Sequence, residues 1–331
     1  MSTIDYSGAP NPVYQGLFAD FTRAIDYVGL DIARPVPIDG LSGTYPLAVR
    51  SVYDRSKTAL SYDPNDAQAL MSSPLPASHS ITSATVSLDY FGNFHDIPRV
   101  SNFEALGIDK YAFAIKNLAA NAVDRHAAVL GDFIGTTGNY DSSYRADQAD
   151  LNTATNGVME NILTAVDAVL DWANGSLMPS DIAIVANPLV TKALSKNEDF
   201  TKSVAGNAQD QRITRSQVGN VLAAETGGAQ FFTMRQRGIG PSGTEGYAFG
   251  NHIAIVAMGG PGELAFAQTF TDDGNASENA GENVVERQQN LSRIEIGRFD
   301  NRDGETATAH SYFKVKSDHQ KLGYLLFDAL S

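Results

Sequence analysis

The sequence predicts an α+β protein, and three observations carry this prediction. Apolar residues recur at three- and four-residue steps across residues 108–133, which predicts one amphipathic helix of about 25 residues. Helical patterns and short apolar strand patterns alternate between residues 156 and 237, which is typical of a mixed helix and sheet domain. From residue 247 onward most segments alternate apolar with polar residues, as strands do.

The N-terminal part of the chain predicts elements that cannot bury themselves. Four prolines surround a short amphipathic patch at residues 13–28, which predicts an extended arm with a small helix that needs another surface. Two extended segments follow, at 44–54 and 80–98, with a polar piece at 55–79 between them. An isolated two-stranded ribbon is only marginally stable, so we expect it to pack on a neighbour. The alternative is a hairpin folded back on its own domain.

Two amphipathic helices dominate the middle of the chain. The first is predicted to end at Gly131 or Gly135, and a polar linker follows it. The second is predicted between Asn156, which suits an N-cap, and Gly175, which suits a stop. The apolar stripe of the first helix consists of Ile108, Tyr111, Ala112, Ile115, Leu118, Ala122, His126, Val129 and Phe133.

Two local units are the sharpest structural signals. Residues 182–186 predict a buried strand, and Asn187-Pro188 then begins a helix, because proline suits a first helical turn. Residues 214–237 predict a helix, a Gly-Gly stop and a strand. Further strands are predicted at 247–259, 262–270, 293–300 and 306–317, the last two joined as a hairpin around Asp303-Gly304.

Composition excludes several classes of function. The chain has 24 Lys and Arg against 38 Asp and Glu, a net charge of -14, which argues against wrapping nucleic acid or lying on an anionic membrane. It has no cysteine, so no disulfide or thiolate metal site is expected. The N-terminus lacks the features of a signal peptide, and no apolar run reaches membrane-spanning length. We therefore expect a cytosolic product that is not exported through a signal peptide.

One glycine-rich segment has the spacing of a nucleotide cradle. Gly238, Gly240 and Gly243 form G-x-G-x-x-G, which binds pyrophosphate when a strand precedes it and a helix N-terminus follows. Here the sequence after Gly243 alternates like a strand, and Pro241 removes a backbone donor. We therefore interpret the segment as a flexible connection between strands, and expect no cofactor there.

No catalytic or metal motif is present. His95-Asp96 could begin a pair, but His126 lies on the apolar stripe, and no spacing typical of metal ligands occurs. The acidic run at 270–282 lacks the ligand spacing of a calcium-binding loop. Lys57 is expected to be an ordinary solvated lysine. We predict no catalytic, cofactor or metal residues, although a triad assembled in space stays open. The histidines are His79, His95, His126, His252, His310 and His319.

The order of elements resembles the Hong Kong 97-type fold of the major capsid proteins of tailed bacteriophages. The resemblance covers nearly the whole chain, and its best local patterns are the strand-Asn-Pro-helix turn at 182–194 and the helix-Gly-Gly-strand unit at 214–237. The resemblance implies an N-terminal arm (1–43), an extended two-stranded loop (44–100), a spine helix and peripheral domain (101–180, with 285–331 returning to it) and an axial domain (181–284).

The resemblance also implies a function. It implies a structural subunit, not an enzyme, that self-assembles into pentamers and hexamers of an icosahedral capsid and encloses double-stranded DNA without sequence-specific binding. The implied partners are further copies of the chain, portal and scaffolding proteins and, in some members, decoration proteins, with no membrane. Such a protein is assembled in the cytoplasm of the bacterial host and ends in the virion.

Two departures and two alternatives qualify this expectation. No long charged scaffolding segment precedes the arm, which predicts that scaffolding is a separate protein or absent, and no local motif marks a covalent cross-link. An encapsulin-like nanocompartment shell would share the fold while enclosing enzymes. An α/β enzyme with a site assembled in space is the alternative from a different class.

Overall fold

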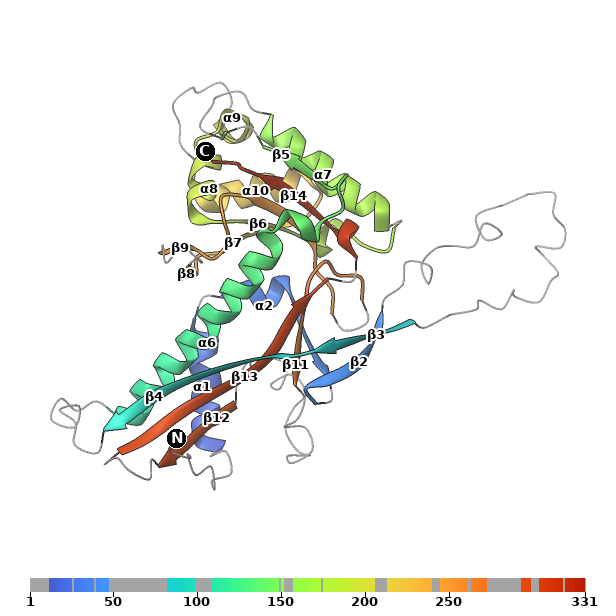
Figure 1. Cartoon of the computed structure of the whole chain (residues 1–331). Coiled ribbons are helices and arrows are strands. Elements are labelled where there is room, and N and C mark those ends of the chain that lie inside the picture. The colour runs from blue at the N-terminus through green and yellow to red at the C-terminus, as the bar shows by residue number, and fades with distance from the viewer. Residues whose placement is uncertain are drawn as a thin grey trace, which may run out of the picture.

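A long helix joins two sheets in this protein (Figure 1). The structure is a computed structural model. It describes residues 12–25, 27–38, 40–47, 82–98, 109–148, 150–151, 157–173, 175–205, 213–239, 245–260, 263–272, 293–298, 304–317 and 319–330. The sheets are named below after their central strands, β10 and β13. Helix α6, which runs from Lys110 to Gly135, passes from one sheet to the other.

The β10 sheet forms the larger core. Its central strands β6 and β10 have the same sequence, Ile-Ala-Ile-Val-Ala, and every residue of both is buried, as expected for a sheet covered on both faces. β14 and β6 pair antiparallel with β10, while β5 and β7 run parallel to β14 and β6. In spatial order the sheet contains β5 (Arg145–Asp147), β14 (Gly323–Phe327), β10 (Ile253–Ala257), β6 (Ile182–Ala186) and β7 (Gln230–Thr233).

Short helices cover the β10 sheet. α7 packs against β14 and β10, and α10 packs against β7. The α-helices are α7 (Val158–Ala173), α8 (Pro188–Leu194), α9 (Glu198–Ala205) and α10 (Arg215–Glu225). The 3-10 turns are η1 (Thr137–Asn139), η2 (Pro179–Asp181) and η3 (Gln320–Leu322).

The β13 sheet is built around one strand of 13 residues. β4 pairs antiparallel along most of one edge of β13, while β12 and β11 pair antiparallel with successive parts of the opposite edge. β1 pairs parallel with β11, on the side of β11 that faces away from β13. The strands are β1 (Pro35–Ile38), β11 (Gln268–Asp272), β13 (Gly304–Lys316), β12 (Arg293–Arg298) and β4 (Asp89–Pro98).

Two further strand pairs complete the described chain. β2 (Ser42–Leu47) pairs antiparallel with β3 (Thr82–Ser87) and forms a ribbon that extends away from the β13 sheet (Figure 1). β8 (Arg237–Ile239) pairs antiparallel with β9 (Glu245–Tyr247). The ribbon confirms two extended segments that pair, whereas the polar piece at 55–79 lies outside the described residues.

The second extended segment does more than the sequence predicts. Only β3 pairs with β2, and from Asp89 the chain continues as β4 and joins β13. The predicted strands at 247–259 and 262–270 are shorter in the structure, because residues 248–252 form a turn and β11 begins only at Gln268. The predicted hairpin between β12 and β13 is confirmed, since Arg298 lies opposite Glu305.

The N-terminal residues find their surface within the same chain, which corrects the argument that they cannot bury themselves. α1 (Pro12–Ala24) packs on α6, and its Phe18 is fully buried. α2 (Gly29–Ile32) and β1 follow, and Ile32 is also fully buried. The apolar face of α1 is thus buried against α6 within one protomer, without a second copy of the protein.

Helix α6 confirms the predicted length, and four residues of the predicted stripe are buried, namely Ile115, Leu118, Ala122 and His126, while Ile108 lies outside the described residues. Asp109 caps it by accepting hydrogen bonds from the backbone nitrogens of Tyr111 and Ala112 at 2.9 and 3.3 Å. Its first half buries residues such as Ile115 and Leu118 in the β13 sheet core. Nearer its C-terminus the buried residues are Leu130 and Ile134, and the predicted Val129 and Phe133 are only half-buried. The buried face changes because this half packs against the other core.

The helix does not end at Gly131, as one prediction had it, but at Gly135. Gly131 has a packing role instead. A Cβ atom built on Gly131 would lie 2.4 Å from the carbonyl oxygen of Ala248, so only glycine allows this loop to cross the helix so closely. At Gly135 the nearest atom to such a Cβ, in the His252 ring, is 3.7 Å away, which is an ordinary contact.

Both local turn units are confirmed. The buried side chain of Asn187 caps α8 by accepting from the Val190 nitrogen at 2.8 Å, and Pro188 is the first helical residue. Thr214 and Gln217 form a capping box at α10. Three of the predicted stops adopt the left-handed backbone that favours glycine, namely Gly175, Gly227 and Gly228, with φ of 78°, 75° and 128°.

Strand pairing links segments that the predicted four-part division separates. β14, near the C-terminus, lies beside β10 in the β10 sheet, whereas β13 pairs with β11, β12 and β4 in the other sheet. α7, assigned with the spine helix, packs against β14 and β10. The boundaries of the division therefore stay a prediction.

We expect Gly131→Ala to lower the free energy of unfolding by about 1–3 kcal/mol, because the new methyl group forces the loop at Ala248 outward. The measurement is urea unfolding of the full chain followed by circular dichroism. Gly135→Ala is the matched control on the same helix, and we expect it to be neutral within about 0.5 kcal/mol. Equal effects of the two substitutions would contradict the close-approach argument.

We expect Asn187→Ala to cost about 2–4 kcal/mol, because the substitution removes two functions at once. The side-chain nitrogen of Asn187 donates to the carbonyl oxygen of Gly250 at 2.9 Å and to Oδ1 of Asn251 at 3.1 Å, while Oδ1 caps α8. Asn187→Ser keeps a capping oxygen and should recover part of the loss in the same unfolding assay. A serine variant no more stable than the alanine variant would argue against the capping contribution.

Candidate functional site

The glycine-rich segment lies between two strands. Gly238 in β8 lies opposite Gly246 in β9, while Gly240 and Gly243 fall outside the described residues. A pyrophosphate site needs a helix N-terminus directly after the glycines, and the next described element is a strand. The interpretation as a connection between strands is confirmed at both of its ends.

The described histidines do not form a common site. No group of three or more His, Asp or Glu side chains that could hold a metal ion occurs in the described parts of the chain. His95 and Asp96 do not form a side-chain pair, because neighbours in a strand point to opposite faces. The His95 ring contacts Asn117 at 3.2 Å instead. His79, Lys57 and residues 273–282 of the acidic run lie outside the described residues.

The remaining histidines contact neighbours from other elements. His252 accepts from the backbone nitrogen of Asp328 at 3.2 Å, and burial lowers its pKa, an effect that Asp328 opposes. His310 contacts the hydroxyl of Tyr90 at 2.9 Å. His319 packs against the ring of Trp172, with ring centroids 5.5 Å apart. These contacts agree with the interpretation of the histidines as structural.

His126 is the centre of a buried polar chain that the sequence does not predict. It is fully buried on α6, and its Nε2 lies 2.9 Å from Oγ1 of Thr269 on β11. Its Nδ1 contacts the hydroxyl of Tyr27, which precedes α2. Thr269 Oγ1 in turn donates to the carbonyl oxygen of Ala33 at 3.0 Å.

The direction of each hydrogen bond in this chain follows from proton counting. The Thr269 hydroxyl has one hydrogen, which goes to the carbonyl oxygen of Ala33, so its oxygen must accept from His126 Nε2–H. His126 therefore has a bare Nδ1, which accepts from the Tyr27 hydroxyl. The chain runs one way, and each of its donors has an acceptor.

Burial shifts the pKa of both ring partners. It lowers the pKa of His126 from 6.5 to about 3, because water cannot solvate the imidazolium. Burial also raises the pKa of Tyr27 well above its usual value, and the charge of Asp124 on α6 adds to this shift. Both groups are therefore neutral at pH 7, as the hydrogen-bond directions require.

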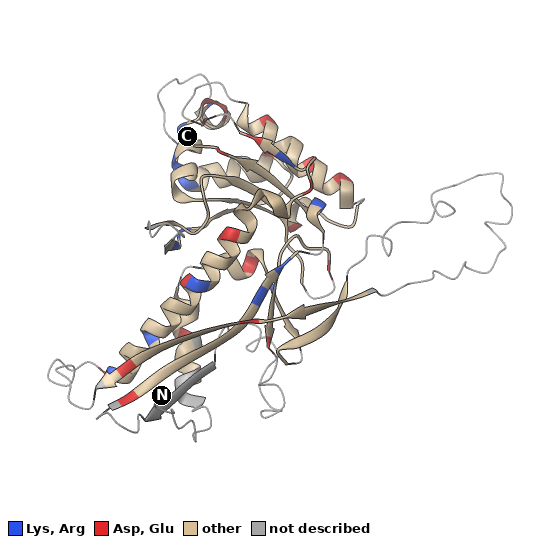
Figure 2. Cartoon of the chain, in the orientation of Figure 1, with Lys and Arg blue, Asp and Glu red and all other residues tan. Residues whose placement is uncertain are grey.

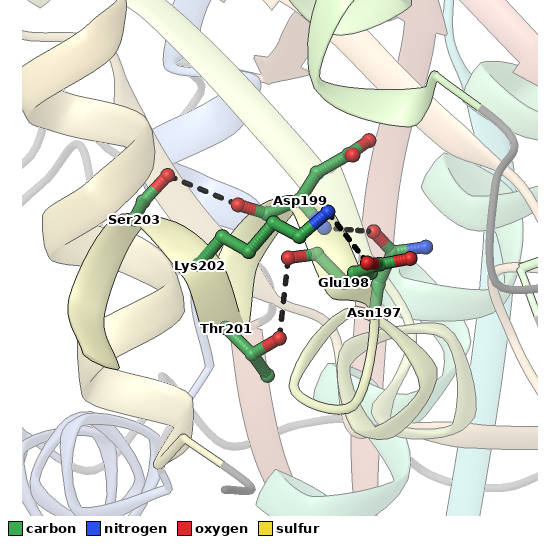
Figure 3. A network of polar contacts seen from close by, with 6 residues as sticks. All are labelled: Asn197, Glu198, Asp199, Thr201, Lys202 and Ser203. Atoms are coloured by element: carbon green, nitrogen blue, oxygen red, sulfur yellow. Dashed lines mark hydrogen bonds and ion pairs between the residues drawn. The ribbon is translucent and has the colours of Figure 1, made fainter. Parts of the chain in front are cut away.

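The start of α9 is capped by side chains from the same stretch of sequence. Asn197 Oδ1 accepts from the Asp199 backbone nitrogen at 3.0 Å, and Lys202 pairs with Glu198 at 2.5 Å (Figure 3). The hydroxyls of Thr201 and Ser203 donate to backbone carbonyls one turn earlier. The polar network therefore stabilises the helix locally.

An edge strand offers the clearest surface for contact with another molecule. β4 is ten residues long and, among the described strands, pairs only with β13, so its other edge is not covered by a described strand. Its side chains alternate. Phe91 and Ile97 point toward α6, where the Arg125 guanidinium lies 5.5 Å from the Phe91 ring centre. Tyr90 and Phe94 point the other way, and their side chains are 53% and 68% exposed.

Charge is not concentrated on this surface. Helix α6 carries both acidic and basic residues along its length (Figure 2). The exposed face of β4 combines aromatic rings with Asp96, and Asp89 at its start pairs with Lys314 at 2.6 Å. Among the described helices, none is both long and apolar enough to cross a lipid bilayer. The exposed rings of Tyr90 and Phe94 give the outer face of β4 an apolar character, which suits contact with a protein surface.

Comparison with known proteins gives matches in structure only. The sequence matches no protein-family model and no curated protein. A phage-related protein of Bordetella bronchiseptica superimposes with a TM-score of 0.70 at 12% identity, over 97% of this chain and 98% of that one. A virus-like particle from Pyrococcus furiosus superimposes with a TM-score of 0.51 at 8% identity, over 95% of this chain and 98% of that one.

The fold class is therefore that of a phage-related protein and of a virus-like particle protein, over almost the full length of the chain. At identities of 12% and 8% these matches show a shared fold. The resemblance drawn from the order of elements is confirmed at the level of the fold.

We expect Phe94→Ser to leave stability within about 0.5 kcal/mol, because its ring is largely exposed in the protomer. Ile97→Ser is the matched control on the same strand, and burial of Ile97 beside α6 predicts a loss of about 2–4 kcal/mol. Urea unfolding of dissociated protomers measures both effects. A large loss for Phe94→Ser would show that this face is covered within the protomer.

Proposed function

We propose that this protein is the structural subunit of a virus capsid, which self-assembles into pentamers and hexamers of an icosahedral shell. The observation that carries the proposal is the match of its fold, over 97% of the chain, to a phage-related protein. In this proposal residues 1–43 are the arm, 44–100 the extended loop, 101–180 with 285–331 the spine helix and peripheral domain, and 181–284 the axial domain.

The shape of the protomer supports a role in assembly. The β2–β3 ribbon extends from the body instead of folding onto it (Figure 1). Its described contacts with the body include a small apolar cluster around Tyr45 and Phe270, and the amino group of Lys316 donates to the Tyr45 hydroxyl at 3.0 Å. A projecting two-stranded ribbon is only marginally stable in a monomer, and it becomes more stable when a neighbouring subunit covers it. The exposed face of β4 supplies a second surface of this kind.

The charge supports enclosure rather than tight binding of the genome. A net charge of -14 repels a polyanion, so double-stranded DNA inside such a shell would stay free to leave. Portal and scaffolding proteins, and decoration proteins in some shells, are the further partners of such a subunit. The virion, assembled in the host cytoplasm, is then its place of action.

A nanocompartment shell that encloses proteins is the second candidate. The match to the Pyrococcus furiosus virus-like particle supports a particle-forming subunit under either candidate, since the fold alone does not distinguish one content from another. The nucleic acid and protein content of purified particles decides between the two. An enzyme with a site assembled in space predicts instead a small species without particles.

The first test is the size of the expressed full chain under assembly conditions. We expect particles of megadalton mass by size-exclusion chromatography and closed shells by electron microscopy, because the fold matches proteins of this kind. A small species without particles across the salt and pH conditions tested would contradict the shell proposal.

The second test removes the contact surfaces. Deletion of residues 54–79, which lie outside the described residues, should leave a folded core and block assembly, and normal particles from this variant would refute the role of the ribbon.

Phe94→Ser should lower the yield of particles at least several-fold, because it removes an exposed aromatic contact. Phe94→Leu keeps an apolar side chain and is the matched control. Equal particle yields for both Phe94 variants would exclude this ring from assembly.

A further inference from the structure

The buried polar chain begins and ends on one segment of the protein. Tyr27 and Ala33, which make the two outer contacts, both belong to residues 27–38, whereas His126 lies on α6 and Thr269 on β11. The backbone nitrogen of Thr269 also donates to the carbonyl oxygen of Arg34, just before β1 pairs with β11. The chain therefore fastens this segment to two elements that are distant from it in sequence.

The buried polar chain formed by Tyr27, His126 and Thr269 has no acceptor for an additional proton other than the ring nitrogen that already accepts from Tyr27. A proton on Nδ1 of His126 would turn the acceptor of the Tyr27 hydroxyl into a donor, and the hydroxyl hydrogen would then lose its partner. The positive charge would also be fully buried. The described groups that face the ring are Tyr27, Thr269 and Phe313, none of them anionic at neutral or acidic pH.

The charged groups nearby do not offset this charge. Asp124 lies on the same helix as His126, and its charge acts on Tyr27; burial raises the pKa of the Asp124 carboxyl, so acid neutralises it sooner. Asp31 and Arg34, on the fastened segment itself, are exposed to solvent. An imidazolium at this position would therefore be stabilised only by water, which must enter when the segment moves away.

We propose that the Tyr27–His126–Thr269 chain is an acid-sensitive latch, which holds residues 27–38 on α6 and β11 and releases them when His126 takes a second proton. The segment also makes other contacts, namely the buried Ile32, the four-residue pairing of β1 with β11 and the packing of Val36 and Ile38 in a cluster with Tyr45. They set how rarely the latch opens at neutral pH, whereas His126 sets how opening depends on pH.

The sign and size of the effect follow from proton linkage. The pKa of His126 is about 3 when the latch is closed, and it returns to about 6.5 in water when the latch is open. The open state therefore binds more protons between these values, so acid favours it. The opening equilibrium should be constant above about pH 6.5 and should rise roughly tenfold for each pH unit below that value.

Hydrogen exchange of the full chain, read by mass spectrometry between pH 7.5 and 4.5, tests the latch. Protection factors correct for the pH dependence of intrinsic exchange. In the wild-type chain we expect protection of residues 27–38 to fall roughly tenfold per pH unit below about 6, while protection of β6 and β10 changes much less. The proposal is overturned if these regions lose protection in parallel, a result that needs no variant to interpret.

Two substitutions identify the group that titrates. His126→Gln keeps a donor and an acceptor but cannot take the proton, so the excess slope at residues 27–38 should disappear. Tyr27→Phe removes one hydrogen bond and keeps His126, so opening should increase roughly three- to tenfold at pH 7.5 while the acid slope remains. His319→Gln is the matched control, because His319 packs against Trp172 and takes no part in the buried polar chain. This variant should behave as wild type.

The variants also give decisive negative outcomes. An unchanged acid slope in His126→Gln would show that another group drives the opening. A slope that disappears in His319→Gln would assign the effect to that histidine. Loss of the slope in Tyr27→Phe would place the titration outside His126, since this variant retains the imidazole.

Discussion

Burial of one helix in two different cores is the constraint on which the rest of the structure depends. The first half of α6, with Ile115 and Leu118, packs with Phe18 of α1 against the β13 sheet. Its second half, with Leu130 and Ile134, belongs to the core of the β10 sheet. A helix of 26 residues is about 39 Å long, so it can span both cores as one rigid element. The two sheets therefore keep a fixed relation as long as both halves of α6 remain buried.

The crossing between the two cores is also where the structure admits polar groups. His126 lies between the residues of α6 that serve the β13 sheet and those that serve the β10 sheet, and its hydrogen bonds reach Tyr27 and Thr269. A fully satisfied polar chain specifies one arrangement of the segments that it joins, because any shift leaves a buried donor or acceptor unpaired. The same requirement makes the arrangement sensitive to a single proton. Apolar packing at this crossing would be more tolerant of both displacement and acid.

Surfaces that are incomplete in one protomer lie mainly at the β13 sheet. The β2–β3 ribbon and the exposed face of β4, with Tyr90 and Phe94, are continuous in sequence. The N-terminal α1 differs, since Phe18 is already buried against α6. In the proposed assembly β4 and the ribbon are therefore the candidate contact surfaces, and the N-terminal helix is not.

Local patterns in the sequence determined much of the fold and little of its sites. The sequence alone predicts the period of α6, the start of α8 at Asn187-Pro188 and the stops at Gly227 and Gly228, because each depends on neighbours within a few residues. The partners of His126 are 99 and 143 residues away, and the histidine could be recognised only as a polar residue on an apolar stripe. The role of Gly131 was equally hidden, because the backbone of Ala248 that crosses it comes from another part of the chain. Tertiary structure alone decided these contacts, since they exist only when distant segments are brought together.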